Sequence, residues 1–392
     1  MLPILFRSSD QGAPTLNNVA GSLISVLDAC LVTGFNTLNV SSLVVASNIC
    51  TVTTSTTHGL VPDQRVTITG AATTSLNGDK LIATVPTTTT FTFAVTQADV
   101  TESPGSCTLK RTSLGWIKEY TGTNKAIYKM SNVSSYGQML RVDDSTAGVD
   151  ARIFGVESAT SVDSFTDKFP TEAQVAGGLY ATRGANNATA KFWAIVGDDR
   201  FFYVITEASA RFSTFPTTLV YGIWNFGDII SYKPGEAYGC TIMAPGSTTA
   251  SVPDGAVTQG VIMGSAPSLN NQRICRGQSG LVKSVGIAPS HPGFNIVGNS
   301  GPVYPSPVDN GMVLSSPSFI VESLAYAGNP IRGILPGFLT PMVLNSSLTD
   351  IVGGEIITST DGTNRRFIIF KNCSRSASID TCAAFDLSQA WR

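Results

Sequence analysis

One serine and one histidine lie in the chain order of a nucleophilic catalytic triad. Ser300 lies in "VGNSGP" between Gly298 and Gly301, and His58 lies far upstream with many aspartates between the two. In a triad the histidine takes the serine proton and an aspartate orients the histidine. His58, however, begins a turn in a segment that reads as a separate module, and Asn-Ser-Gly is ordinary turn chemistry. The sequence therefore predicts no catalytic serine.

Other groups that bind ions or move protons are sparse. His291 precedes a proline, which holds its backbone extended and is typical of a loop. The pairs Asp143-Asp144 and Asp198-Asp199 offer the oxygen ligands that hard cations prefer. Adjacent side chains on a strand point to opposite faces, so neither pair makes a site by itself, and the second pair predicts a turn between two strands. With no phosphate-binding loop or dinucleotide motif, the sequence predicts no enzyme, no cofactor and no metal site.

Seven cysteines are scattered along the chain, and no two have the spacing C-x-x-C. With only two histidines, the zinc-binding patterns are excluded. Cys50 in "SNICTVTT" and Cys107 in "GSCTLKR" are expected on strands that lie side by side. They form either a pair of buried thiols or a cross-strand disulfide, and a reducing compartment favours the thiols.

The composition points to a protein that packs against other proteins. Charged residues make up 13% of the 392 residues, against about 25% in an average soluble domain, and the formal net charge is -2. A neutral, hydroxyl-rich surface lacks the charge repulsion that opposes association. The near-zero charge argues against nucleic acid as a partner. The alternative is a secreted β-protein with an uncharged polar coat.

No segment has the pattern of a signal peptide or a membrane span. The start "MLPILFRSSDQGAP" lacks a basic stretch followed by a long apolar run. No stretch reaches the roughly 20 apolar residues that a membrane helix needs. We therefore expect a soluble protein made in the cytoplasm.

The N-terminal segment, residues 1–41, predicts an arm and one helix that belong to the core. In "TLNNVAGSLISVLDACLVTGF" the apolar residues repeat at helical spacing and define one face: Val19, Leu23, Val26, Leu27, Cys30 and Leu31. Asn17 or Asn18 is the expected N-cap, and Gly34 fits the position after the last turn. Asp28 is expected at an exposed helix flank, with an interface role as the alternative.

Residues 42–112 predict an inserted small β-domain of Ig-like or barrel type. β-Branched runs alternate with Gly, Asn, Asp and Pro, and in "RVTITG" Val66 and Ile68 face one way while Thr67 and Thr69 face the other. Asn77-Gly78 predicts a tight turn that closes a hairpin. Such a unit has turns at both ends and a core of its own.

The remaining chain predicts a β-sandwich, so the expected fold class is mainly β. Residues 113–245 hold short apolar strands and form the sandwich core. Residues 246–392 begin as a Gly-, Ser- and Pro-rich segment, suited to binding loops, and end as strands that return to the core, with a hairpin at Asp361–Thr363. We expect the four tryptophans in the core, with an interaction surface as the alternative: Trp116, Trp193, Trp224 and Trp391. Trp391 predicts a chain end docked on the fold.

An ordered set of motifs resembles the virion structural proteins of tailed bacteriophages, mostly tail-associated proteins. These motifs are "GAPTLNNVAGSLISVLDACLVTGFN", "YTGTNKAIYKM", "LRVDD", "FPTEAQVAGG", "WAIVGDDRFFYV", "FGDIISYKPGEAYGC" and "IRGILPGFLTP". The resemblance covers nearly the whole chain and depends on the order of the motifs. The stretch "THGL", Val-x-Ile-x-Gly, "LNG" and "TTTFTF" is similar to small β-modules of phage tail and fibre proteins. Relatives carry a more basic, histidine-containing C-terminal motif where this chain has Ile334 and Val343, so no metal or charge role is carried over.

The resemblance implies a non-enzymatic component of the virion, assembled in the host cytoplasm. Its expected position is the tail, at the tip or baseplate, the collar or a fibre attachment, and its expected partners are copies of itself and other virion proteins. One alternative is a tail protein that binds a receptor or host surface polysaccharide through the loops of residues 246–320. The other is a capsid decoration protein. For the structural component we expect the β-core and the C-terminal block to pack in the particle while the inserted domain, residues 42–112, projects outward.

Overall fold

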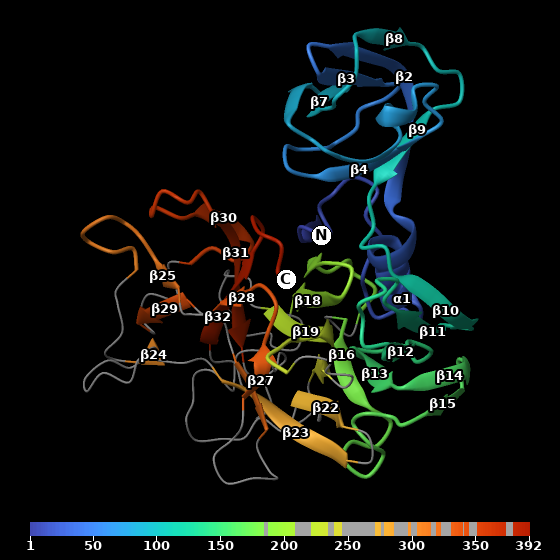
Figure 1. Ribbon diagram of the computed structural model, residues 1–392. Coiled ribbons are helices and arrows are strands. Elements are labelled where there is room, and N and C mark those ends of the chain that lie inside the picture. Colours follow the sequence, from blue (N-terminus) through green and yellow to red (C-terminus); the bar gives the residue numbers. More distant parts are fainter. Residues whose placement is uncertain are drawn as a thin grey trace.

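The computed structural model describes residues 1–183, 187–207, 221–233, 239–244, 271–275, 278–285, 297–298, 304–314, 319–322, 331–339, 341–344, 351–373 and 379–392. Three β-layers form the body of the molecule, and a small β-domain stands out from them (Figure 1). The fold is mainly β with one N-terminal helical segment among the described residues, as the sequence predicts.

The middle layer contains strands that are buried on both faces. Its described strands are β1 (Ile4–Arg7), β17 (Trp193–Gly197), β18 (Phe201–Glu207), β19 (Tyr221–Asp228) and β21 (Cys240–Met243), hydrogen-bonded in that order. Side chains alternate between two cores: Phe202 and Val204 face one, while Phe201 and Tyr203 face the other. A strand with two buried faces must be apolar at every position, which explains the continuous run "FFYVIT".

The sheet continues from β21 through five further strands. In order these are β22 (Asn271–Cys275), β23 (Gln278–Val285), β26 (Phe319–Glu322), β27 (Ile331–Ile334) and β20 (Ile230–Ser231). A separate group contains β24 (Val297–Gly298), β29 (Pro341–Leu344) and β25 (Val313–Leu314).

A five-stranded antiparallel sheet covers one face of the middle layer. It contains β10 (Ile117–Gly122), β11 (Lys125–Lys129), β12 (Met139–Asp143), β13 (Asp150–Val156) and β16 (Leu179–Thr182), with the hairpin β14 (Ser158–Ser161) and β15 (Ser164–Thr166) beside it. The helix α1 (Ser22–Leu27) and a π-helical turn (Asp28–Thr33) contribute their apolar face to the same core.

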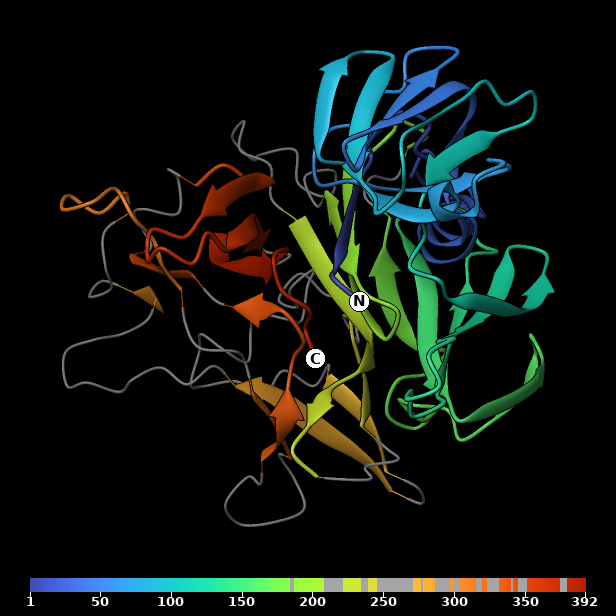
Figure 2. The same cartoon turned by 45° about the horizontal axis from the view of Figure 1, so that its top comes forward.

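The C-terminal strands belong to the same hydrogen-bonded sheet, which β31 joins by pairing with β19 at Tyr221 and Asn372, and they fold back over the opposite face of the middle layer. They are β28 (Phe338–Leu339), β30 (Glu355–Thr358), β31 (Arg366–Cys373) and β32 (Ile379–Asp386). Asp361–Thr363 lies in the β30–β31 hairpin, and Trp391 is docked in the core, so both predictions are confirmed. Both chain ends lie close together in Figures 1 and 2, because β1 pairs with β17 and Arg392 contacts Asp198 at the end of the same strand.

The small β-domain has its own hydrophobic core. Its strands are β2 (Phe35–Ala46), β3 (Ile49–Thr54), β4 (Arg65–Thr69), β5 (Gly78–Leu81), β6 (Thr84–Thr87), β7 (Thr90–Ala94), β8 (Val100–Glu102) and β9 (Thr108–Arg111). Inward side chains such as Val66 and Ile68 fill this core, while Thr67 lies on the other face. Strand β2 begins at Phe35, before the expected domain boundary at residue 42, and Phe35 itself belongs to the core of the main body.

The domain is connected through a narrow neck where its first and last strands are paired. Phe35 lies opposite Arg111, and the chain then returns beside the helical segment through hydrogen bonds from Leu114 N to Cys30 O (2.9 Å) and Trp116 N to Leu31 O (2.8 Å). Gly34 has φ +72°, and a Cβ there would lie 2.2 Å from Arg111 O. Gly34 therefore ends the helical segment, as predicted, and also permits the close approach of the two strands.

Three local expectations are wrong. The helix begins at Ser22 after Gly21, so neither Asn17 nor Asn18 is the N-cap, and Val19 is exposed before the helix. Asp28 is half-buried and accepts hydrogen bonds from Lys118 and Tyr128, which tie the helical segment to β10 and β11. Asn77-Gly78 does not form a two-residue turn.

The connection from β4 to β5 is instead a longer loop that Asn77 holds together. This loop contains the 3₁₀ turn Thr74–Leu76. The Asn77 amide both accepts from Ala71 N (3.0 Å) and donates to Ala71 O (2.8 Å). The asparagine thus closes the hairpin through its side chain.

A buried ion pair provides the missing helix cap. The Asp144 carboxylate accepts hydrogen bonds from Leu23 N (2.8 Å) and Ile24 N (3.3 Å) at the start of α1. Arg183 pairs with Asp144, and neither side chain is exposed. Burial raises the pKa of Asp144, while the charge of Arg183 opposes the shift. The backbone N–H groups at a helix start need acceptors, and here a distant strand end provides one.

We predict that Asp144→Asn lowers the free energy of unfolding by about 3–5 kcal/mol, because Arg183 would be left buried without its counter-charge. Asp143→Asn is the matched control: its carboxylate is partly exposed and interacts with Ser145 and Arg141, so the expected loss is about 1 kcal/mol or less. Urea unfolding of both variants measures the difference. Equal losses would contradict a structural role specific to Asp144.

Candidate functional site

His58 is buried in the small domain, where its ring holds a turn. Its Nδ1 accepts a hydrogen bond from Leu60 N (2.9 Å), and the ring packs edge-on against Phe91 at 5.7 Å. Its Nε2 is buried and has no hydrogen-bond partner among the described residues. Ser300 and His291 lie outside the described residues, so the geometry of a triad is not defined. The turn that His58 begins leads directly into the cleft described below.

The aspartate pairs separate as the alternation of strand side chains predicts. Asp143 faces outward toward Arg141 and Lys125, whereas Asp144 points into the core. Asp198 lies between β17 and β18 and accepts hydrogen bonds from Arg200 N (2.8 Å) and Phe201 N (2.7 Å). The pair therefore marks a strand turn. Within the part of the chain that the structure describes, no cluster of three or more metal-ligating side chains occurs.

Cys50 and Cys107 are free thiols in the core of the small domain. Cys50 lies in β3 and Cys107 just before β9, and both β3 and β9 pair with β2, which lies between them. The prediction that the strands of Cys50 and Cys107 lie side by side is therefore wrong. Burial raises the pKa of Cys50 to about 11, which keeps this sulfur protonated at neutral pH.

All four tryptophans lie in the core. Trp116 and Trp193 donate their indole N–H to Asp198 O (3.1 Å) and Pro14 O (3.0 Å), and Trp391 donates to Asp386 O (3.0 Å). Trp224 is buried against Phe202. In this conformation none of the four offers a surface to a ligand.

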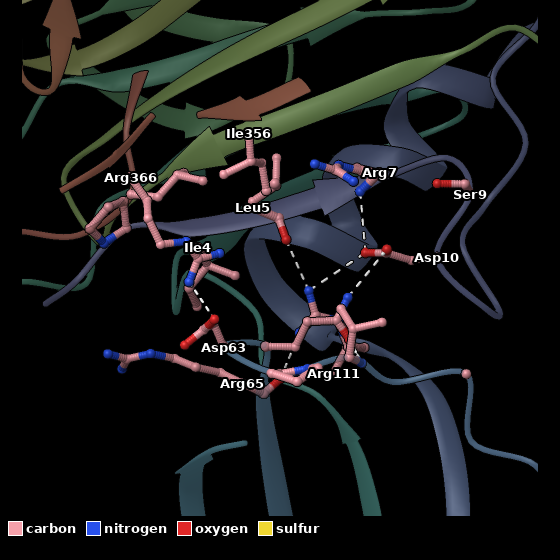
Figure 3. Close-up of a pocket in the computed structure, with 16 residues that line it drawn as sticks. Ile4, Leu5, Arg7, Ser9, Asp10, Asp63, Arg65, Arg111, Ile356 and Arg366 are labelled. Atoms are coloured by element: carbon pink, nitrogen blue, oxygen red, sulfur yellow. Dashed lines mark hydrogen bonds and ion pairs between the residues drawn. The ribbon is translucent and has the colours of Figure 1, made fainter. Parts of the chain in front are cut away.

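A cleft of about 270 Å³ lies where the small domain, the N-terminal strand and the C-terminal layer meet (Figure 3). We call it the junction cleft. Its lining residues are Pro3, Ile4, Leu5, Arg7, Ser9, Asp10, Gly59, Val61, Pro62, Asp63, Gln64, Arg65, Arg111, Ile356, Arg366 and Leu387. The segment 59–65 follows His58 directly, so the small domain contributes its base to the cleft.

Arg111 and Asp10 form the buried wall of the junction cleft. The Arg111 guanidinium donates to Arg65 O (3.0 Å) and Leu5 O (2.9 Å), and it lies 3.5 Å from the Asp10 carboxylate. Burial raises the pKa of Asp10, against the opposing charge of Arg111, and burial lowers the pKa of Arg111. This one side chain thus binds the small domain, β1 and the N-terminal turn together.

Arg7, Arg65 and Arg366 complete the cationic lining. Arg7 donates to Gly354 O (3.3 Å), and its Nε is buried without a partner. Arg366 pairs with Asp63 of the small domain. The Arg65 side chain has no hydrogen bond or ion pair with any described residue. Guanidinium groups bind carboxylate and phosphate through paired N–H donors, so the chemistry of this lining is anion recognition.

No sequence pattern marks this site, because its arginines lie in four separate segments and Arg366 is more than 250 residues from the other three. Only the turn residues of segment 59–65 were conspicuous in the sequence. The lining contains no histidine or cysteine, and Ser9 is its one serine.

No protein-family model matches the chain, and no curated protein matches it at a significant level. Among the helices of the described ranges, none is long and apolar enough to cross a membrane.

We predict that Arg111→Met destabilises the fold by about 3–5 kcal/mol at pH 7.5, because Asp10 would be buried without its counter-charge. The raised folded-state pKa of Asp10 means that its ionisation reduces stability as the pH rises through that pKa. Without Arg111 this reduction grows, so the deficit of the variant relative to the parent protein should shrink at pH 4.5. Urea unfolding at both values measures it.

Arg65→Gln is the matched control, because the Arg65 side chain has no partner among the described residues, and it should unfold like the parent protein. Adding Asp10→Asn to Arg111→Met should recover part of the loss at pH 7.5. A deficit that is the same at both pH values would show that the Arg111–Asp10 charge pair does not determine the effect.

Proposed function

We propose that the chain is a non-enzymatic structural component of a tailed-bacteriophage virion, most consistent with a tail position, that works by assembly with copies of itself and with other virion proteins. The ordered motifs from "GAPTLNNVAGS" to "IRGILPGFLTP" support this proposal, as does the low content of charged residues, 13%. A nearly neutral surface favours association because it lacks electrostatic repulsion.

The observation that carries the proposal is the architecture of the neck. A layered body carries a small domain with its own core, and the two strands that enter and leave this domain are paired at Phe35 and Arg111 (Figure 1). The domain extends from the body and contacts it at its base, where Asp63 pairs with Arg366 and Arg111 donates to Leu5 O. A part built this way can be held in a particle by its body and present the domain to a neighbour.

We predict that the purified chain self-associates. Native mass spectrometry of the purified chain at micromolar concentration should show a homo-oligomer of one defined copy number, because symmetric assembly uses one repeated interface. A chain that stays monomeric at every concentration would contradict the self-assembly part of the proposal.

We predict that the body folds and assembles without the small domain. Replacing residues 36–110 by Asn-Gly joins the paired Phe35 and Arg111 through a tight turn and keeps both residues, which contact the body. The variant should still unfold cooperatively and keep the copy number of the parent chain. Loss of folding or of the oligomer would show that the domain is part of the assembling body and does not project from it.

A further inference from the structure

We propose that the junction cleft is a binding site for a compact anion that carries a phosphate or carboxylate group. The charge of the cleft lining supports this proposal. Four arginines line the cleft, Arg7, Arg65, Arg111 and Arg366, and only two aspartates face them. An excess of positive charge in a partly enclosed site attracts anions, because low-dielectric walls concentrate the field.

The cleft also contains a guanidinium group that no described residue binds. Arg65 makes no hydrogen bond or ion pair within the described ranges, although its backbone carbonyl is held by Arg111. The Nε atoms of Arg7 and Arg111 also have no hydrogen-bond partner among the described residues, but both atoms are buried and do not face the open part of the cleft. The unpaired donor group that lines the cleft is therefore the Arg65 guanidinium.

The carboxylates of the cleft leave room for such an acceptor. Asp10 is already engaged by Arg7 N (3.2 Å) and by Arg111 at 3.5 Å. Asp63 pairs with Arg366 only, and its side chain is 55% exposed. In the view of Figure 3, Arg366 and Arg65 lie on the two sides of Asp63. An incoming anion can therefore replace the Asp63 carboxylate as the partner of Arg366 and bind the Arg65 guanidinium at the same time.

The size of the cleft limits the ligand. Its volume of about 270 Å³ lies just below the roughly 300–1,000 Å³ that is usual for ligand sites. This fits a free oxyanion or a single acidic sugar unit. The apolar part of the lining, which includes Ile4, Val61 and Ile356, can cover the non-polar face of such a unit.

Binding also has a structural consequence. Arg65 belongs to the small domain and Arg366 to the C-terminal layer, so one anion bound between them would connect the domain and the body. The ligand is therefore expected to fix the small domain against the body and to raise the melting temperature of the full chain. This site goes beyond the proposed function and does not depend on a virion role.

Isothermal titration of the full chain at low ionic strength tests the site with three probes: inorganic phosphate, D-glucuronate and uncharged D-glucose. The two anions should bind saturably with one site per chain, and glucose should not. Phosphate as the tighter ligand indicates a free oxyanion, and glucuronate as the tighter ligand indicates an acidic sugar unit. No saturable binding of either anion, or equal binding of glucose, would overturn the proposal.

Three variants locate the binding. Arg65→Gln and Arg366→Gln should each weaken anion affinity about tenfold or more, since each removes a charge-assisted hydrogen bond. Arg152→Gln is the control, because Arg152 stacks on Tyr180 in the five-stranded sheet and should change the affinity by less than about twofold. Thermal melting without ligand checks that each variant is folded. Equal affinities in Arg65→Gln and the parent chain would place the anion elsewhere.

Discussion

The burial of β17, β18 and β19 on both faces is the constraint on which the rest of the structure depends. Each of these strands must supply apolar side chains to two cores at once, so both faces of the sheet need a covering layer. The five-stranded sheet and the helical segment cover one face, and the C-terminal strands cover the other. Trp193 and Tyr203 are the large side chains that fill the two sides.

The N-terminal segment is the structural link between the body and the small domain. Strand β1 lies at the edge of the middle layer, and its backbone accepts a hydrogen bond from Arg111 at the end of β9. The turn that follows contacts the base of the small domain, where Gln11 Nε2 donates to Thr57 O (2.8 Å). The junction cleft lies at this meeting point, so a ligand there would act where body and domain are joined.

Periodic patterns in the sequence predict the strands well, because side-chain burial repeats every two residues. The alternation in "RVTIT" and the unbroken apolar run in "FFYVIT" correspond to one buried face and to two. The helix start could not be predicted from neighbouring residues, since its cap comes from Asp144, far away along the chain. Likewise, Asn77-Gly78 has the sequence of a tight turn, but the amide of Asn77 bonds to Ala71 and closes a longer loop.

The sequence could not predict the candidate site, because contacts between residues far apart along the chain create it, as they create the helix cap. An arginine in a sequence is normally a solvated surface residue, and only tertiary packing buries Arg111 and brings Arg7, Arg65 and Arg366 around one cleft. His58 was conspicuous as a potential catalytic base, yet its ring shapes the turn that leads into that cleft. His58 thus helps to shape the site, whereas the residues proposed to bind the ligand are arginines that no sequence pattern singles out.

The central proposal, that this chain is an assembled part of a phage particle, is tested most directly by quantitative mass spectrometry of virions purified from a culture that expresses its gene. The account predicts peptides from both the small domain and the body, in equal amounts and in multiple copies per particle. Virions that are intact and infectious but lack these peptides would contradict the claim.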